Sequence, residues 1–195
     1  NTEIINVKGK HVYPGLISAG SSLGLQEINA VRSTLDYAET GSINPNVRAN
    51  VSYNPDSELI PVSRSNGILI AHIIPKSGRI PGISSVMMLD GWTWEDCTLD
   101  HPTAMNLIWP AMDLNFNSWN KTSHKDQLKN RNKSLDEINE LFKSARAYLK
   151  LDKTSLDFKS NPRLEALSQV VNGDLQLIIR ANKVKQIEAA VYWGD

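Results

Sequence analysis

The sequence predicts an α/β protein built around a parallel sheet. Residues 67–75 are apolar on both faces, rich in β-branched side chains and closed by a proline, which is typical of a strand in a parallel sheet covered on both sides. Near the end of the chain, a helix over 161–172, a strand over 175–179 and a helix over 183–193 follow one another. This alternation is typical of a parallel barrel or a doubly wound sheet.

The N-terminal part carries weaker signals. Residues 4–13 are expected to form a β-hairpin, because two β-rich runs flank Lys8-Gly9-Lys10 and a glycine between such runs is a turn signal. Leu16 and Ile17 are expected to continue as a short buried strand. Residues 24–65 are rich in Asn, Ser and Pro and lack strong periodicity, so we expect a long ordered loop with one or two helical turns.

The clearest helical pattern lies at 134–149. Ser134 and Glu137 have the spacing of a capping box, and apolar residues then repeat every three or four positions. The basic segment before it, 121–133, is expected to be a solvated loop or the start of the helix. The sequence therefore predicts a helix that begins at Ser134.

The second helix has signals at both ends. Asn161 is a good N-cap and Pro162 stands at the first helical position, where proline is well tolerated. Asn172-Gly173 is a stop signal, because glycine adopts the left-handed conformation that commonly ends a helix. The boundaries 161 and 172 are thus predicted from local chemistry alone.

Composition limits the classes of partner. The 195 residues include 21 Lys and Arg and 21 Asp and Glu, a balance that gives no electrostatic footprint for nucleic acid. No apolar run approaches the roughly 18 residues of a membrane span. The single cysteine, Cys97, excludes an intrachain disulfide and a multi-cysteine zinc site. We therefore expect a small-molecule substrate or ligand, no nucleic acid and no membrane, in either the cytoplasm or the periplasm.

The segment Pro14-Gly15-Leu16-Ile17 to Leu23-Gly24 resembles the first barrel strand of the amidohydrolase superfamily. In those metal-dependent hydrolases, Pro-Gly-Leu-Ile is followed by two histidines that hold a catalytic metal. Here the two histidine positions are Gly20 and Ser22. Glycine offers no ligand atom, and a serine hydroxyl is a poor ligand for a divalent transition metal compared with imidazole.

The resemblance continues further along the chain. Residues 66–92 look like the second strand and following loop of imidazolonepropionase-like amidohydrolases, and residues 161–182 look like the helix and strand that carry the next metal-binding histidine. That strand ends in Arg180-Ala181 in place of His-Ala. An arginine there places a permanent cation where a metal would sit. It is expected either to form a structural salt bridge or to bind a carboxylate or phosphate.

The fold that this resemblance implies is part of a TIM-like (β/α)₈ barrel. Residues 14–195 would form an incomplete amidohydrolase-like barrel with an insertion at about 99–160, and residues 1–13 would be the end of the flanking β-sandwich. A whole barrel needs about 250 residues, so we expect a fragment of a longer protein. Its free strand edges would favour a homo-oligomer.

Two functions remain open at this point. The resemblance implies hydrolysis of a C–N bond in an amide or cyclic amide, with activity lost in the fragment. The alternative is a non-catalytic ligand-binding or assembly protein that keeps the barrel fold. The expected substrate-binding residues are Ser18, Ser22 and Arg180, and no catalytic residue can be assigned. We expect no metal ligand among Gly20, Ser22 and Arg180 and no cofactor in this chain, whereas zinc or another divalent metal is compatible with the full-length protein.

Other chemistry is less strongly indicated. His72 lies inside the predicted buried strand and is expected to be a core histidine with its hydrogen bonds satisfied. The tryptophans between residues 90 and 120 fit either packing or a binding platform, and they are Trp92, Trp94, Trp109 and Trp119.

Overall fold

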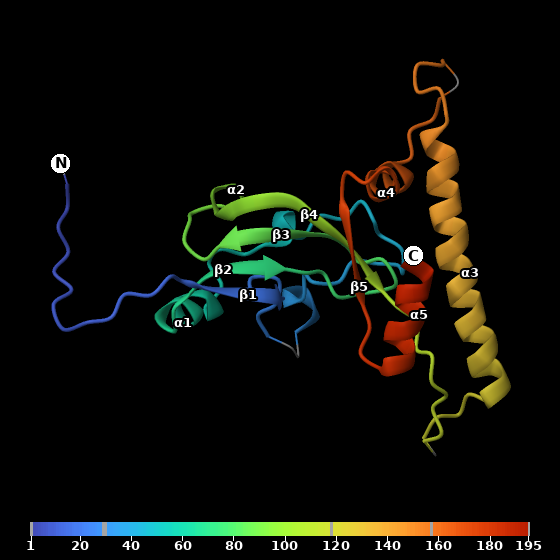
Figure 1. Cartoon of the computed structure of the whole chain (residues 1–195), viewed down its shortest axis with the longest axis horizontal. Coiled ribbons are helices and arrows are strands. Elements are labelled where there is room, and N and C mark those ends of the chain that lie inside the picture. Colours follow the sequence, from blue (N-terminus) through green and yellow to red (C-terminus); the bar gives the residue numbers. More distant parts are fainter. Residues whose placement is uncertain (1, 29–30, 118, 157, 195) are drawn as a thin grey trace.

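A computed structural model describes residues 2–28, 31–117, 119–156 and 158–194, and it shows one curled sheet with its three longest helices gathered at one end (Figure 1). The five strands lie in the sheet in the order in which they occur in the sequence. They are β1 (Leu16–Ser21), β2 (Ile68–Ile73), β3 (Gly82–Met88), β4 (Thr98–Ile108) and β5 (Gln176–Arg180).

The sheet is mixed, not parallel as the sequence predicted. β1 and β2 are parallel, as are β4 and β5, but β3 is antiparallel to both of its neighbours. The connections explain this, because residues 74–81 and 89–97 are shorter than the dozen or so residues that a parallel crossover needs. Four strands therefore end at the same edge of a curled half-barrel, which we call the carboxyl-end edge.

The helices divide the core into two clusters. The helix cluster packs α3 (His124–Leu149), α4 (Pro162–Asn172) and α5 (Val184–Gly194) near β4 and β5, with Met105, Leu107 and Leu167 fully buried. The loop cluster lies over β2 and β3, where α1 (Leu59–Ser65), α2 (Trp94–Cys97) and the 3₁₀ turn Ala49–Ser52 belong to the covering segments. The other 3₁₀ turn, Arg32–Thr34, has no buried residue.

The C-terminal predictions agree well with the structure. α4 has Asn161 as its N-cap, with Oδ1 accepting from the amides of Arg163 and Leu164, and ends at Gly173 with φ of 85°. The strand predicted over 175–179 is β5, and the helix predicted over 183–193 is α5. Local capping chemistry was sufficient here, because these signals act within one turn of the helix end.

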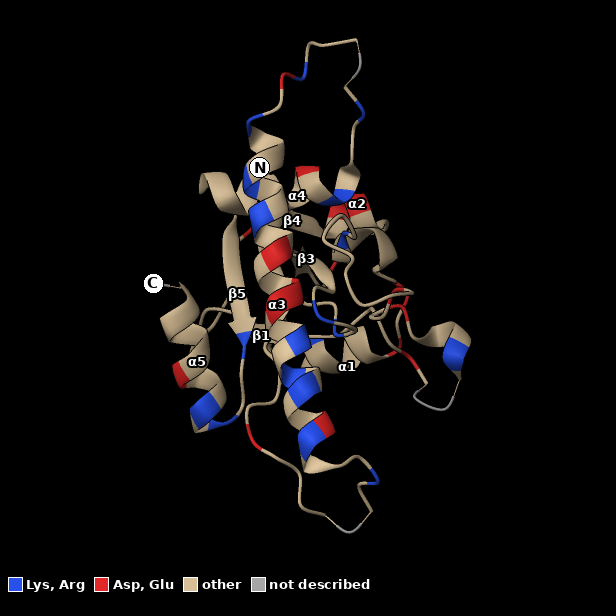
Figure 2. Ribbon diagram, turned by 90° about the vertical axis from the view of Figure 1, so that its right-hand side faces the viewer, with Lys and Arg blue, Asp and Glu red and all other residues tan. Residues whose placement is uncertain are grey.

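The cap predicted at Ser134 is wrong, whereas the alternative that residues 121–133 contain the start of the helix is confirmed. α3 begins at His124, ten residues before Ser134, and its cap is Ser123, whose Oγ accepts from the amide of Asp126 at 3.1 Å. The spacing Ser123-x-x-Asp126 supplies an earlier cap of the same kind, so the helix runs through the predicted one. Figure 2 shows both basic and acidic residues along α3, with the acidic ones mainly in its middle turns. The polar residues 124–133 therefore form the first turns of α3, a helix whose outer face is solvated.

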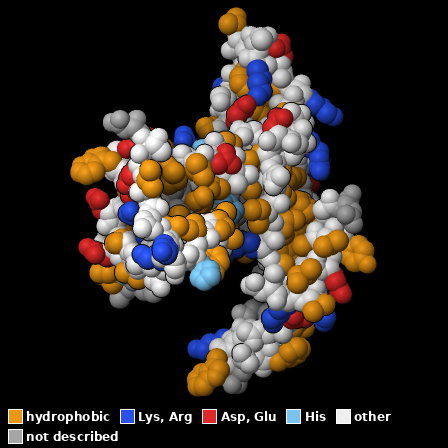
Figure 3. All heavy atoms as spheres, turned by 60° about the vertical axis from the view of Figure 1, so that its left-hand side comes forward, with side chains coloured by type: hydrophobic (Ala, Val, Ile, Leu, Met, Phe, Trp, Pro, Cys, Tyr) orange, Lys and Arg blue, Asp and Glu red, His pale blue; other side chains and the backbone are white. Residues whose placement is uncertain are grey.

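The N-terminal hairpin is also wrong. Residues 2–15 contain a turn, in which the Lys10 amide donates to the Val7 carbonyl at 2.9 Å, but no strand among the described positions. The segment extends away from the sheet (Figure 1), and Ile4 is 90% exposed. Leu16 and Ile17 are exposed rather than buried because β1 is an edge strand. Figure 3 shows hydrophobic side chains at the surface on this side of the molecule.

The segment expected as an insertion, 99–160, begins with part of the sheet. β4 is an eleven-residue strand that pairs with both β3 and β5, and the chain leaves the sheet only after Ile108. The remainder, up to residue 160, consists of a loop, α3 and a second loop. The long helix covers the helix cluster through Ile138, Phe142 and Ala145.

Candidate functional site

Two of the predicted ligand-binding residues lie at the carboxyl-end edge and are joined to the same dipeptide. Ser22 follows β1, and its Oγ accepts a hydrogen bond from Lys76 Nζ at 2.8 Å. Arg180 ends β5, and its Nη1 donates to the Pro75 carbonyl at 3.3 Å. The curl of the sheet thus brings the ends of β1, β2 and β5 together, although these strands are not all neighbours.

Arg180 lies on the face of the sheet opposite the helix cluster. It pairs with Ile108, and Ile108 follows Leu107, which is buried in the helix cluster. Side chains alternate between the faces of a strand, so Arg180 lies on the face away from the helices. Among the described residues it forms no ion pair, so the salt bridge expected as one alternative is not formed there.

β1 is irregular at the other predicted positions. Ser18 pairs with Ala71 and is half-buried, and the register then shifts between Ser18 and Ser21. Gly20 lies within this irregularity with φ of 73°. An L-residue in that conformation is strained, so the strand has a local geometry that favours glycine over a side-chain ligand.

The residues at the family's metal positions do not fit a metal. Gly20 has no donor atom, Ser22 already accepts from a lysine, and Arg180 is a permanent cation. Across the described ranges no group of three or more His, Cys, Asp and Glu side chains is arranged to hold a metal ion. No mechanistic step through a metal can be assigned to these residues.

The glycines of the family-like motif, by contrast, have clear structural roles. A Cβ on Gly15 would lie 2.4 Å from Leu69 Cδ1 of β2, and a Cβ on Gly24 would lie 2.4 Å from Cε2 of the Tyr53 ring. Gly24 also has φ of 73°. A side chain at Gly15 would require Leu69 to move, and one at Gly24 would require the buried Tyr53 ring to move, so both glycines contribute to packing.

Arg79 is a third cation near this edge, and it faces the helices. Its Nη1 donates to the Ile108 carbonyl at 3.0 Å, whereas Nε is buried without a partner in the described part of the chain. Burial lowers the pKa of Arg79, and the negative charge of Glu137 on α3 opposes this. Arg79 therefore serves the junction between the sheet and α3 and does not extend the site of Lys76 and Arg180.

The histidines and tryptophans do not form a site in the described residues. His72 is half-buried with Nε2 lacking a partner, so the expectation of a satisfied core histidine is wrong, and burial lowers its pKa. His101 Nδ1 lies 2.8 Å from Ser85 Oγ, but Ser85 is completely buried and cannot reach a substrate. Trp109 is buried in the helix cluster, whereas Trp92 and Trp119 are largely exposed, so they form no platform with it.

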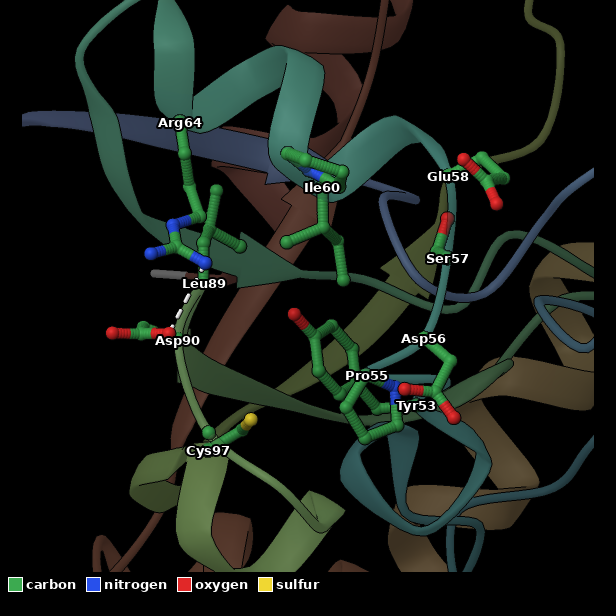
Figure 4. Close-up of a pocket in the computed structure, with 12 residues that line it drawn as sticks. Tyr53, Pro55, Asp56, Ser57, Glu58, Ile60, Arg64, Leu89, Asp90 and Cys97 are labelled. Carbon is green, nitrogen blue, oxygen red and sulfur yellow. Dashed lines mark ion pairs between the residues drawn. The ribbon is translucent and has the colours of Figure 1, made fainter.

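A cavity of about 270 Å³ lies between α1, the segment before it and the turn after β3 (Figure 4). We call it the α1 cavity. Tyr53 is 4% exposed, and its hydroxyl has no hydrogen-bond partner in the described residues. At the mouth, Arg64 Nη1 lies 3.1 Å from Asp90 Oδ1. No motif in the sequence points to this cavity, because its walls come from segments that are far apart in the chain.

Comparisons with known proteins support the fold of this chain but give no evidence of an activity. No family model matches the chain, and no curated protein matches it in sequence. A crystal structure of an amidohydrolase from Thermotoga maritima MSB8 matches it with a TM-score of 0.75 and 18% sequence identity, over 98% of this chain. The chain spans 53% of that amidohydrolase. The chain thus has an amidohydrolase-related fold, and it corresponds to about half of the matched protein.

Proposed function

We propose that this chain is a non-catalytic variant of the amidohydrolase-related fold, and that its carboxyl-end edge binds a small anion such as a carboxylate. The observation that carries the proposal is the pair formed by Lys76 and Arg180. Lys76 donates a hydrogen bond to the Ser22 hydroxyl, and Arg180 donates one to the Pro75 carbonyl. Both oxygens are neutral, and neither cation has an ion-pair partner among the described residues.

The charges favour an anion over a neutral ligand. A guanidinium carries five N–H donors in a planar fork, and Arg180 uses one of them on Pro75 in the described structure. Lys76 is exposed and has three rotatable donors, one of which contacts Ser22. A carboxylate placed between these two side chains would gain charge-assisted hydrogen bonds from both.

Hydrolysis of a C–N bond is the second candidate, favoured by the structural match to an amidohydrolase. It would require groups outside this chain, because the described residues at the edge offer neither a metal-ligand set nor a base paired with a nucleophile. The half-buried Ser18, for example, forms no hydrogen bond with a histidine among the described residues that could activate its hydroxyl.

The binding proposal is tested by isothermal titration with acetate, succinate and inorganic phosphate. We expect binding of at least one of these anions, with the Kd raised about tenfold by Arg180→Gln and about threefold by Lys76→Ala. Arg163→Gln is the matched control, because Arg163 is exposed at the start of α4. Absence of binding by all three anions, or equal losses in the control, would overturn the proposal.

The hydrolytic alternative needs its own measurement. We expect elemental analysis of the full gene product, purified without chelator, to find no stoichiometric zinc, iron or manganese at this edge. Stoichiometric metal together with turnover of a cyclic amide would replace the binding proposal by the hydrolytic one. If stoichiometric metal were found without turnover, and its content were unchanged in Ser22→Ala and Arg180→Gln, the metal would lie elsewhere in the protein. The anion titration would then decide whether the edge binds an anion.

A further inference from the structure

The α1 cavity lies apart from the carboxyl-end edge and has a different chemistry. Its walls come from the segment around Tyr53, from α1, from the turn after β3 and from α2. Three lining residues are acidic, namely Asp56, Glu58 and Asp90, whereas Arg64 is the single basic lining residue. Neither the family-like motif nor the proposed anion site involves these side chains.

The strongest sign of a ligand is the Tyr53 hydroxyl. The side chain is almost completely buried, and Oη has no hydrogen-bond partner in the part of the chain that the structure describes. Figure 4 shows the hydroxyl pointing away from Pro55 and toward the side formed by Leu89 and Arg64. A buried polar group without a partner costs about 1–3 kcal/mol, and a ligand that supplies the missing hydrogen bond would recover part of that cost.

The residues that line the cavity carry a net negative charge, with the carboxylates of Asp56 and Glu58 exposed and pointing away from the Tyr53 hydroxyl (Figure 4). Arg64 is already paired with Asp90, so Asp56 and Glu58 have no cationic partner among the described residues. Burial raises the pKa of the Cys97 thiol, and the charges of Asp96 and Asp90 raise it further. Burial likewise raises the pKa of Tyr53 well above its ordinary value, so both groups are neutral at pH 7. A neutral phenol can accept a hydrogen bond from a cation.

The rest of the lining is apolar and suits a short hydrocarbon chain. Ile60 and Leu89 are buried members of the loop cluster, and two prolines, Pro55 and Pro61, complete this part of the wall. We propose that the α1 cavity binds a small protonated aliphatic amine, whose ammonium donates to Tyr53 Oη and is attracted by the net negative charge of the lining residues, and whose chain contacts Ile60 and Leu89. The cavity, of about 270 Å³, is slightly smaller than the roughly 300–1,000 Å³ pockets that hold drug-sized ligands, so it has room for a short-chain amine.

The test uses three probes that share one chain and differ in charge: n-butylamine, 1-butanol and butyrate. Isothermal titration at pH 7 is expected to detect butylamine, weaker binding of butanol and no binding of butyrate at this cavity. Because butyrate could bind at the carboxyl-end edge, the titrations are repeated in Arg180→Gln. Butyrate binding that persists in that variant and equals butylamine binding would overturn the proposal.

Two matched pairs of variants locate the site. Tyr53→Phe is expected to raise the Kd of butylamine about tenfold, whereas Tyr192→Phe, on the exposed side of α5, is expected to leave it unchanged. Asp90→Asn is expected to raise it about threefold, and Asp136→Asn on α3 is the control. An unchanged Kd in Tyr53→Phe would overturn the proposal.

A second readout protects this test against misfolding. Because the Tyr53 hydroxyl has no partner among the described residues, the ligand-free Tyr53→Phe variant is expected to unfold at the same urea concentration as the parent chain, or at a higher one. A marked loss of stability without ligand would show that the hydroxyl is bonded within the protein. That result would also overturn the proposal.

Discussion

The two candidate sites differ in how their polar groups are satisfied. At the carboxyl-end edge, Lys76 and Arg180 contact neutral oxygens of the chain itself, so the charges are exposed or half-buried and solvated in part. In the α1 cavity, the phenol of Tyr53 is buried and its hydroxyl has no hydrogen-bond partner in the described residues. Substitutions of Lys76 or Arg180 are therefore expected to change the free energy of unfolding little. The cavity, by contrast, is lined by buried residues of the loop cluster, so substitutions that alter this packing are expected to destabilise the protein.

Of the substitutions considered, Gly24→Ala should lower the free energy of unfolding most, because Gly24 packs against Tyr53 beside the α1 cavity. The new methyl group would overlap the Tyr53 ring, and φ of 73° disfavours an L-residue, so we expect a loss of about 3 kcal/mol in the free energy of unfolding. Urea denaturation measures it. Gly67→Ala is the control, because Gly67 has φ of 85° and a methyl group there would have no described atom within 4 Å, so about 1 kcal/mol is expected. Equal losses would mean that Tyr53 moves aside freely.

Gly20→His should have a smaller effect, confined to the carboxyl-end edge. It restores the side chain that the family resemblance expects, but at φ of 73°, with only an ordinary contact to Ile74. We expect the free energy of unfolding to fall by about 1–2 kcal/mol, from backbone strain alone. A stability equal to that of the parent would show that β1 readily straightens and that the glycine is not required there.

The sheet between the sites should respond to pH through His101. Burial and the charge of Arg48 lower its pKa, so folding favours the neutral ring. The resulting stability is present above the ordinary value of 6.5 and is lost as the pH falls through the lowered pKa. Urea midpoints at about pH 7.5 and about pH 5.5 should therefore differ more for the parent than for His101→Gln. The same difference in both proteins would assign the pH dependence to other groups, such as His72.

Lys76→Ala should have the smallest effect on stability. The side chain is exposed and its one contact in the described structure is with Ser22 Oγ, so we expect a change below about 0.5 kcal/mol. Thermal unfolding measures this directly. A loss above about 1 kcal/mol would make the lysine a structural residue and would remove the contrast between the two regions.

The sequence was informative where the signal was local. Asn161, Pro162 and Gly173 define α4 through hydrogen bonds and backbone angles within a turn of its ends. The direction of β3 was not predicted, because apolar character in β2 does not distinguish parallel from antiparallel neighbours. The hairpin predicted over 4–13 is absent for a related reason. A strand forms only where it can pair with another strand and pack one face, and a β-rich composition does not guarantee either.

The two sites differ in the same respect. The resemblance to amidohydrolases led to Ser22 and Arg180, and the fold does bring both to one edge, but nothing in the sequence pointed to Lys76 or Pro75 as their contacts. The α1 cavity had no sequence signal at all. Tyr53 is one aromatic residue in a long irregular segment, and only tertiary packing against Gly24 and α1 buries it.

The contact between Arg180 and Pro75 has a thermodynamic consequence. It joins two positions 105 residues apart, so the backbone carbonyl is an intramolecular competitor that is always present at high effective concentration. An anion that takes this same donor must displace the carbonyl, and its measured affinity is then the difference between the two interactions. An anion that uses the other N–H groups of Arg180 avoids this cost, so the edge is expected to favour anions that leave the contact between Arg180 and Pro75 in place.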